Sequence, residues 1–115
     1  MIDDDRSLVQ SIIGLLESLG YAATGFASAE DFLKSPDLHR SACLILDVHM
    51  PAMGGLELQR RLLSENNRTP IIFITANGGQ DIAAEALRRG AVALLRKPFD
   101  QASLLEALRS ALMED

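Results

Sequence analysis

Cysteine is almost absent from this sequence of 115 residues, since Cys43 is the single one. It cannot form an internal disulfide, and it lies in an apolar run, where a thiol usually packs as a small buried hydrophobe. No apolar run approaches the roughly 20 residues that a membrane-spanning helix needs, and no secretory signal is evident. These absences exclude a disulfide scaffold and an integral membrane protein, and they favour a cytoplasmic domain.

Positive charge is also scarce, with 11 lysines and arginines against 16 aspartates and glutamates and a formal net charge of −5. Such a domain is repelled by a phosphate backbone, so we expect no direct binding of nucleic acid. Apolar residues, in contrast, make up 48% of the chain, which is enough for a core without cross-links. We predict a single domain over residues 1–115.

Short apolar runs alternate with amphipathic segments along the whole chain. The helical spacing of apolar residues, with Ser28 and Asp100 as caps, predicts helices at 8–19, 28–35, 55–65, 81–89 and from Asp100 onward. Strands are predicted at residues 1–2, 21–26, 42–46, 71–74 and 91–95. Unbroken apolar strands belong to parallel sheets with both faces covered, so the fold class is a doubly wound α/β sheet.

The first of these strands is a special case, because only Met1 and Ile2 precede an acidic run. A typical strand has about five or six residues. We predict a flavodoxin-like sheet of five parallel strands in the order 2-1-3-4-5, with a truncated first strand at its centre. A longer central strand would pair with both neighbours, so we expect the native protein to carry a few further residues before Met1.

Polar residues follow the predicted strands at their carboxyl ends. They are Asp3, Asp4 and Asp5 after the first strand, Asp47 after the third, Thr75 after the fourth, and Arg96 with Lys97 after the last. Open α/β sheets place their sites at this edge. Taken singly, the aspartates are ordinary helix caps, and the other residues are ordinary sheet or surface residues. These ordinary roles do not explain why the polar residues occur together.

Crowded carboxylates also need a partner of opposite charge. Two of them about 5 Å apart repel by roughly 3 kcal/mol at an effective dielectric near 20. A hard divalent cation with oxygen ligands relieves this repulsion, and Mg²⁺ needs only a few protein oxygens because it keeps several waters. Lys97 adds a further positive charge. The sequence therefore predicts a site for a metal ion and then for a phosphoryl group.

The chain resembles the receiver domain of two-component response regulators from Ile2 to about Leu112. Four motifs carry the resemblance in the family's order, at residues 2–5, 46–51 with Gly54, 74–76 and 97–99. More weakly, residues 28–33 resemble receivers that precede a helix-turn-helix output domain.

The resemblance implies a phosphorylation switch rather than an enzyme. Asp47 would accept a phosphoryl group from a phosphohistidine, carried by a sensor histidine kinase or a histidine phosphotransfer protein. Thr75 would bond a phosphoryl oxygen, and Lys97 would pair first with Asp47 and then with the phosphate. The switch would alter a partner surface or a phosphorylation-dependent homodimer.

The resemblance also implies a set of ligands for Mg²⁺. Asp3, Asp4 and Asp47 would supply carboxylate oxygens, directly or through water. His49 would supply its backbone carbonyl and not its imidazole.

Two positions bear on how such a switch would work. Leu94 stands three residues before the lysine, where receivers usually carry an aromatic ring, so coupling through a ring is not expected. Asn77 borders the path of the attacking water, so it is a candidate for setting the lifetime of the phosphoryl group.

Three alternatives remain open. A haloacid-dehalogenase-type phosphatase needs a second acid two residues after its nucleophile, where this chain has His49. A flavodoxin-like cofactor binder would not place Asp3–Asp5 where a phosphate binds. A degenerate receiver that only binds other proteins typically loses the acceptor, an acid or the lysine, and this chain has all of them.

Overall fold

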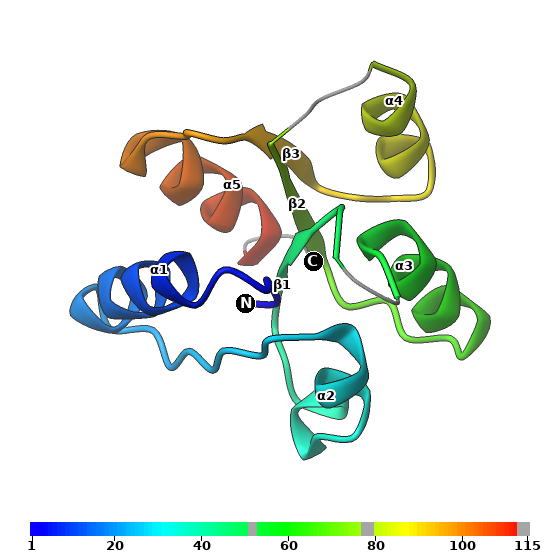
Figure 1. Ribbon diagram of the computed structural model, residues 1–115, viewed down its shortest axis with the longest axis horizontal. Coiled ribbons are helices and arrows are strands. Elements are labelled where there is room, and N and C mark those ends of the chain that lie inside the picture. Colours follow the sequence, from blue (N-terminus) through cyan, green and yellow to red (C-terminus); the bar gives the residue numbers. More distant parts are fainter. Residues whose placement is uncertain (51–52, 77–79, 113–115) are drawn as a thin grey trace.

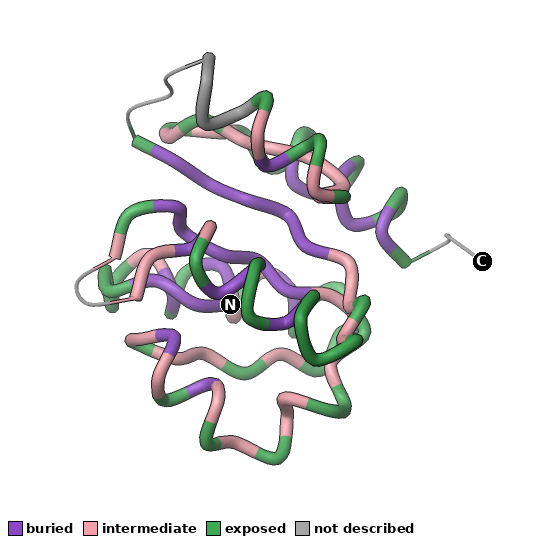
Figure 2. The backbone as a smooth tube through the Cα atoms, turned by 90° about the vertical axis from the view of Figure 1, so that its right-hand side faces the viewer, coloured by how far each residue is buried: buried purple, intermediate pink, exposed green. Residues whose placement is uncertain are grey.

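A parallel sheet of three strands forms the centre of the protein (Figure 1). The computed structural model describes residues 1–50, 53–76 and 80–112, with side chains left aside at 80–83. The strands lie in the order β1 (Leu44–Asp47), β2 (Ile71–Thr75) and β3 (Ala93–Arg96). Every residue of β1 and β2 is buried, which accounts for their unbroken apolar sequences (Figure 2).

Helices cover both faces of this sheet (Figure 1). On one face lie α1 (Arg6–Ser18) and α5 (Gln101–Leu112), and on the other lie α2 (Ala29–Leu33), α3 (Gly55–Ser64) and α4 (Gln80–Arg88). A short 3₁₀ helix, η1 (Pro36–His39), follows α2 and was not predicted.

The core is divided by the sheet into two clusters, because successive strand residues face opposite sides. Ile45 and Ile74 pack with α1 and α5, and we call this side the α1/α5 face. Leu46 and Phe73 pack with α2, α3 and Ala86 of α4, and we call this side the α3/α4 face.

The prediction of five parallel strands with a truncated first strand is only partly met. In the described residues the first two predicted strands are reduced to parallel bridges that Ile2 makes with Phe26 and with Leu46. Ile2 therefore lies between the second predicted strand and β1, as the order 2-1-3-4-5 requires. The segment before Phe26 forms no strand because the central stub offers it only one bridging residue, and a strand needs a neighbour to pair with.

The helix caps predicted at Ser28 and Asp100 are present, and a further cap changes the start of the first helix. The Ser28 hydroxyl accepts a hydrogen bond from the Asp31 amide at 3.1 Å, and Asp100 caps the Ser103 amide at 2.8 Å. The first helix begins at Arg6 rather than Leu8, because the Asp5 carboxylate accepts a hydrogen bond from the Leu8 amide at 3.2 Å.

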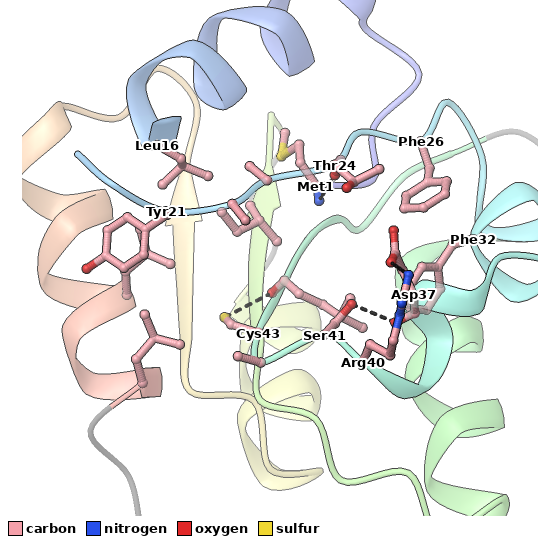
Figure 3. A pocket seen from close by; sticks show the side chains of 17 residues that line it. Met1, Leu16, Tyr21, Thr24, Phe26, Phe32, Asp37, Arg40, Ser41 and Cys43 are labelled. Carbon is pink, nitrogen blue, oxygen red and sulfur yellow. Dashed lines mark hydrogen bonds and ion pairs between the residues drawn. The ribbon is translucent and has the colours of Figure 1, made fainter. Parts of the chain in front are cut away.

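A cavity of about 450 Å³ has neither Asp3, Asp4 nor Asp47 in its lining (Figure 3). Its wall includes Leu16, Tyr21, Phe32 and Cys43, and the Met1 nitrogen donates a hydrogen bond to the Thr24 carbonyl oxygen beside it at 3.0 Å. Cys43 is half-buried rather than fully buried as predicted, and burial raises the pKa of its thiol to about 11, which disfavours the reactive thiolate.

No helix among residues 1–50, 53–76 and 80–112 has both the length and the hydropathy to cross a bilayer.

Candidate functional site

Three carboxylates converge at the carboxyl edge of the sheet. An oxygen from each of Asp3, Asp4 and Asp47 lies within 4.8 Å of the others. Asp3 and Asp47 are buried, whereas Asp4 is exposed. The donor set is entirely oxygen, with one member open to solvent, which suits a hard divalent cation that keeps part of its water shell. The cluster therefore has the composition of a metal site.

The three aspartates at the start of the chain have separate roles. Asp5 caps α1, which is the ordinary role that a sequence assigns to such residues. Asp3 instead accepts a hydrogen bond from the Asp5 amide through Oδ1 at 2.9 Å, which leaves Oδ2 facing Lys97. Only Asp3 and Asp4 join the cluster.

Lys97 supplies the positive charge of the site. Its Nζ lies 3.0 Å from Asp3 Oδ2 and 3.4 Å from Asp47 Oδ2. Burial alone would lower the pKa of Lys97, but the hydrogen bond and charge of Asp3, followed by those of Asp47, outweigh it and raise the pKa above its ordinary value. Lys97 is therefore a permanent cation shared between two carboxylates.

Opposing influences act on the pKa of Asp47. Burial is the largest influence and raises the pKa of its carboxyl above the ordinary 3.8, and the charge of Asp3 adds to the rise. The His49 amide, which donates to Asp47 Oδ1 at 3.1 Å, and Lys97 act in the opposite direction. Each Asp47 oxygen thus has a donor, but the ionised carboxylate is disfavoured overall.

Gly55, the first residue of α3, packs tightly against the end of β1. The Gly55 amide donates to the Val48 carbonyl oxygen at 2.9 Å. A Cβ atom on Gly55 would lie 2.4 Å from the Asp47 carbonyl oxygen and 3.0 Å from Val48 Cα. The predicted motif includes Gly54 and not Gly55, because close approach of the backbone leaves no signal in a single sequence.

Thr75 and Leu94 share the α3/α4 face. Thr75 ends β2, is fully buried, and accepts a hydrogen bond from the Lys97 amide through its carbonyl oxygen at 2.8 Å. Leu94 pairs with Phe73 across the strands and is half-buried in the same cluster. The imidazole of the exposed His49 is not part of the acidic cluster, and Asn77 lies outside the described residues.

The Lys97–Pro98 peptide bond is cis.

The chain is similar in sequence to known regulatory proteins. The family model of the response regulator receiver domain matches residues 1–109. The chain is 43% identical over 114 residues to response regulator protein TodT of Pseudomonas putida, an alignment that covers 97% of this chain and 49% of that protein. It is 38% identical over 112 residues to transcriptional regulatory protein FixJ of Azorhizobium caulinodans, covering 97% of this chain and 53% of that one.

The fold is also similar to those of solved structures. The crystal structure of FixJ-N superposes with a TM-score of 0.87 at 35% identity, covering 99% of this chain and 91% of that one. Chemotaxis protein CheY4 of Vibrio cholerae gives a TM-score of 0.85 at 29% identity, with 96% and 94% covered. The chain spans about half the length of the curated relatives it matches.

Gly55→Ala is expected to lower the free energy of unfolding by about 1–3 kcal/mol, because the added methyl group must displace the backbone of Asp47 or Val48. Gly14 is the matched control, since it is exposed in α1 with no atom near its missing Cβ. Gly14→Ala should raise stability by about 0.5–1 kcal/mol. Urea unfolding of both variants measures the contrast, and equal effects would show that Gly55 is not tightly packed.

Asp47→Asn is expected to raise the melting temperature of the metal-free protein in EDTA near neutral pH. Because the pKa of Asp47 is raised, the folded protein binds a proton more tightly than the unfolded chain, and the ionised group costs stability above its folded pKa. The advantage of Asn should shrink as the pH falls toward 3.8.

Melting curves across this pH range measure the effect. Asp31→Asn, at an exposed residue of α2, controls for the loss of one negative charge. A metal-free Asp47→Asn protein that melts below the parent at neutral pH would contradict the electrostatic argument.

Proposed function

This chain belongs to the response regulator receiver family, whose members are phosphorylation switches rather than enzymes, and we propose that Asp47 is its phosphoacceptor. The observation that carries the proposal is the position of Asp47. It is the carboxylate that ends β1, lies within 4.8 Å of two other carboxylates, and has Lys97 3.4 Å from its Oδ2.

The transfer is a displacement at phosphorus. An Asp47 carboxylate oxygen forms the new bond to phosphorus while the bond from phosphorus to the donor's imidazole nitrogen breaks, and the electron pair leaves with the imidazole. The His49 amide fixes Asp47 Oδ1, which leaves Oδ2 on the side of Lys97 to attack. Lys97 is already cationic, so it meets the incoming phosphoryl oxygens without any proton transfer.

Thr75 contributes from the neighbouring strand. Thr75 ends β2, and its carbonyl oxygen accepts a hydrogen bond from the Lys97 amide, which supports a role for its hydroxyl at the carboxyl edge. Its role in the proposal is to donate a hydrogen bond to a phosphoryl oxygen. Leu94, half-buried beside Phe73, occupies the position where receivers usually carry an aromatic ring that responds to this hydrogen bond.

The metal ion proposed for the site is Mg²⁺. Asp3, Asp4 and Asp47 would hold it, together with the backbone carbonyl of His49, and when bound it would supply positive charge to the phosphoryl oxygens. The all-oxygen donor set supports this choice over softer metals.

The remaining proposals follow from the family. The donor is a phosphohistidine on a sensor kinase or a phosphotransfer protein, and the location is the cytoplasm. Residues 1–115 act as one receiver domain with the strand order 2-1-3-4-5, which the two bridges of Ile2 support. The output is a change of partner surface or of homodimer. Relatives about twice as long as this chain support the idea of a further output domain.

Incubation with acetyl phosphate and Mg²⁺ tests the proposal. We expect intact-mass spectrometry to find one added phosphoryl group on the parent protein, and none on Asp47→Asn or in the presence of EDTA. Asp31→Asn, which removes an exposed carboxylate from α2, should be modified like the parent.

An unmodified parent would favour the degenerate receiver that only binds proteins. A phosphoryl group on Asp47→Asn would show that another residue is the acceptor.

A further inference from the structure

Arg96 stands at the end of β3, next to Lys97, and none of the roles described above uses it. It is exposed, and no carboxylate among the described residues lies within ion-pair distance of it. Other exposed arginines, such as Arg109, likewise form no ion pair within the described part of the chain. What distinguishes Arg96 is its position, because it is the register partner of Thr75 in the parallel ladder between β2 and β3.

The register fixes the side of the sheet on which Arg96 lies. Side chains of register partners in adjacent strands point to the same face, and the strands are about 4.8 Å apart. Leu94 packs on the α3/α4 face and Leu95 on the α1/α5 face, so the alternation along β3 is regular. Arg96 therefore lies on the α3/α4 face beside Thr75.

Lys97 approaches the same edge from the other side. Its ammonium reaches Asp3 and Asp47, and Asp47 follows the alternation of Ile45 on the α1/α5 face. Consecutive residues at the end of one strand thus place two cations on opposite faces of the sheet. The carboxyl edge, where the phosphoryl group would form, lies between them.

The net charge of the phosphorylated site favours a second cationic side chain. In the phosphorylated, metal-bound state, Asp3, Asp4 and a phosphoryl dianion carry close to four negative charges. A divalent cation and Lys97 supply three positive charges. One negative charge stays unbalanced, and Lys97 also pairs with the Asp3 carboxylate at 3.0 Å.

The geometry points to Arg96 as a second phosphoryl-binding cation, which contacts the phosphoryl oxygens from the α3/α4 face while Lys97 contacts them from the α1/α5 face. A guanidinium is always charged and offers parallel N–H donors that match two phosphate oxygens. This inference rests on the proposed function, because it requires a phosphoryl group on Asp47. It adds that the dianion of a small phosphodonor is bound by Arg96 before and during transfer.

The rate of phosphorylation by acetyl phosphate tests this role. The phosphorus–oxygen bond to Asp47 forms as the bond to the acetyl oxygen breaks, and acetate leaves with the electron pair, so no partner protein takes part. Arg96→Gln is expected to lower the second-order rate constant about fivefold at low ionic strength, as expected for one charge-assisted contact at a partly exposed site. Arg96→Lys, which keeps the charge and loses the paired donors, should recover part of the loss.

Arg109→Gln is the matched control. Arg109 is an exposed arginine in the last turn of α5, at the end of that helix away from Lys97, and its loss changes the net charge equally. We expect the control to react at the parental rate. The gap between Arg96→Gln and the parent should narrow as salt screens the contact, which loss of a merely structural contact would not produce.

Equal rates for Arg96→Gln, Arg109→Gln and the parent would overturn the inference and leave the acceptor role of Asp47 intact. So would a defect that appears only with a phosphohistidine protein as donor, because Arg96 would then bind that protein. A parent that acetyl phosphate does not modify at all would overturn the proposed function, and this inference with it.

Discussion

The crowding of three carboxylates around one ammonium is the constraint on which the rest of the site depends. Oxygens of Asp3, Asp4 and Asp47 lie within 4.8 Å of one another, and two of these residues are buried. Repulsion of this kind is tolerated only where opposite charge offsets it. Lys97 provides one positive charge, yet burial, with a further contribution from the charge of Asp3, still holds the pKa of Asp47 above its ordinary value. The site is therefore most stable when it holds further positive charge.

The fold keeps these charges together through a small number of backbone contacts. Ile2 bridges to both neighbours, which fixes Asp3 at the centre of the carboxyl edge. The absence of a side chain at Gly55 lets the start of α3 pack against the Asp47 carbonyl oxygen. The parallel ladder then brings Thr75 and Lys97 to the same edge from β2 and from the end of β3. Together these contacts hold the charged and polar groups of the site at one edge of the sheet.

Much of this arrangement could be predicted because strand ends in a parallel sheet share an edge. The buried runs, the caps at Ser28 and Asp100, and the grouping of Asp3, Asp4, Asp47 and Lys97 all follow from that rule and from local signals. Local sequence could not show that the segment before Phe26 would form only a bridge, since strand formation depends on a partner far along the chain.

Tight packing was equally hidden from the sequence. The close contact at Gly55 depends on how the backbone is arranged in space, and so do the different roles of Asp5 as a helix cap and Asp3 as a member of the cluster. In the sequence Arg96 resembles any surface arginine, and only the strand register shows that it is the neighbour of Thr75. Such features require coordinates, because one sequence specifies which residues are near in the chain and not which backbones touch.

The response of the melting temperature to Mg²⁺ tests the central claim about charge most directly. The account predicts that Mg²⁺ stabilises the parent, by about 2.7 kcal/mol at a concentration one hundred times its Kd. In Asp4→Asn the metal-free protein should melt above the metal-free parent, and the gain from Mg²⁺ should be smaller. A parent protein whose melting temperature does not respond to Mg²⁺ would contradict the account.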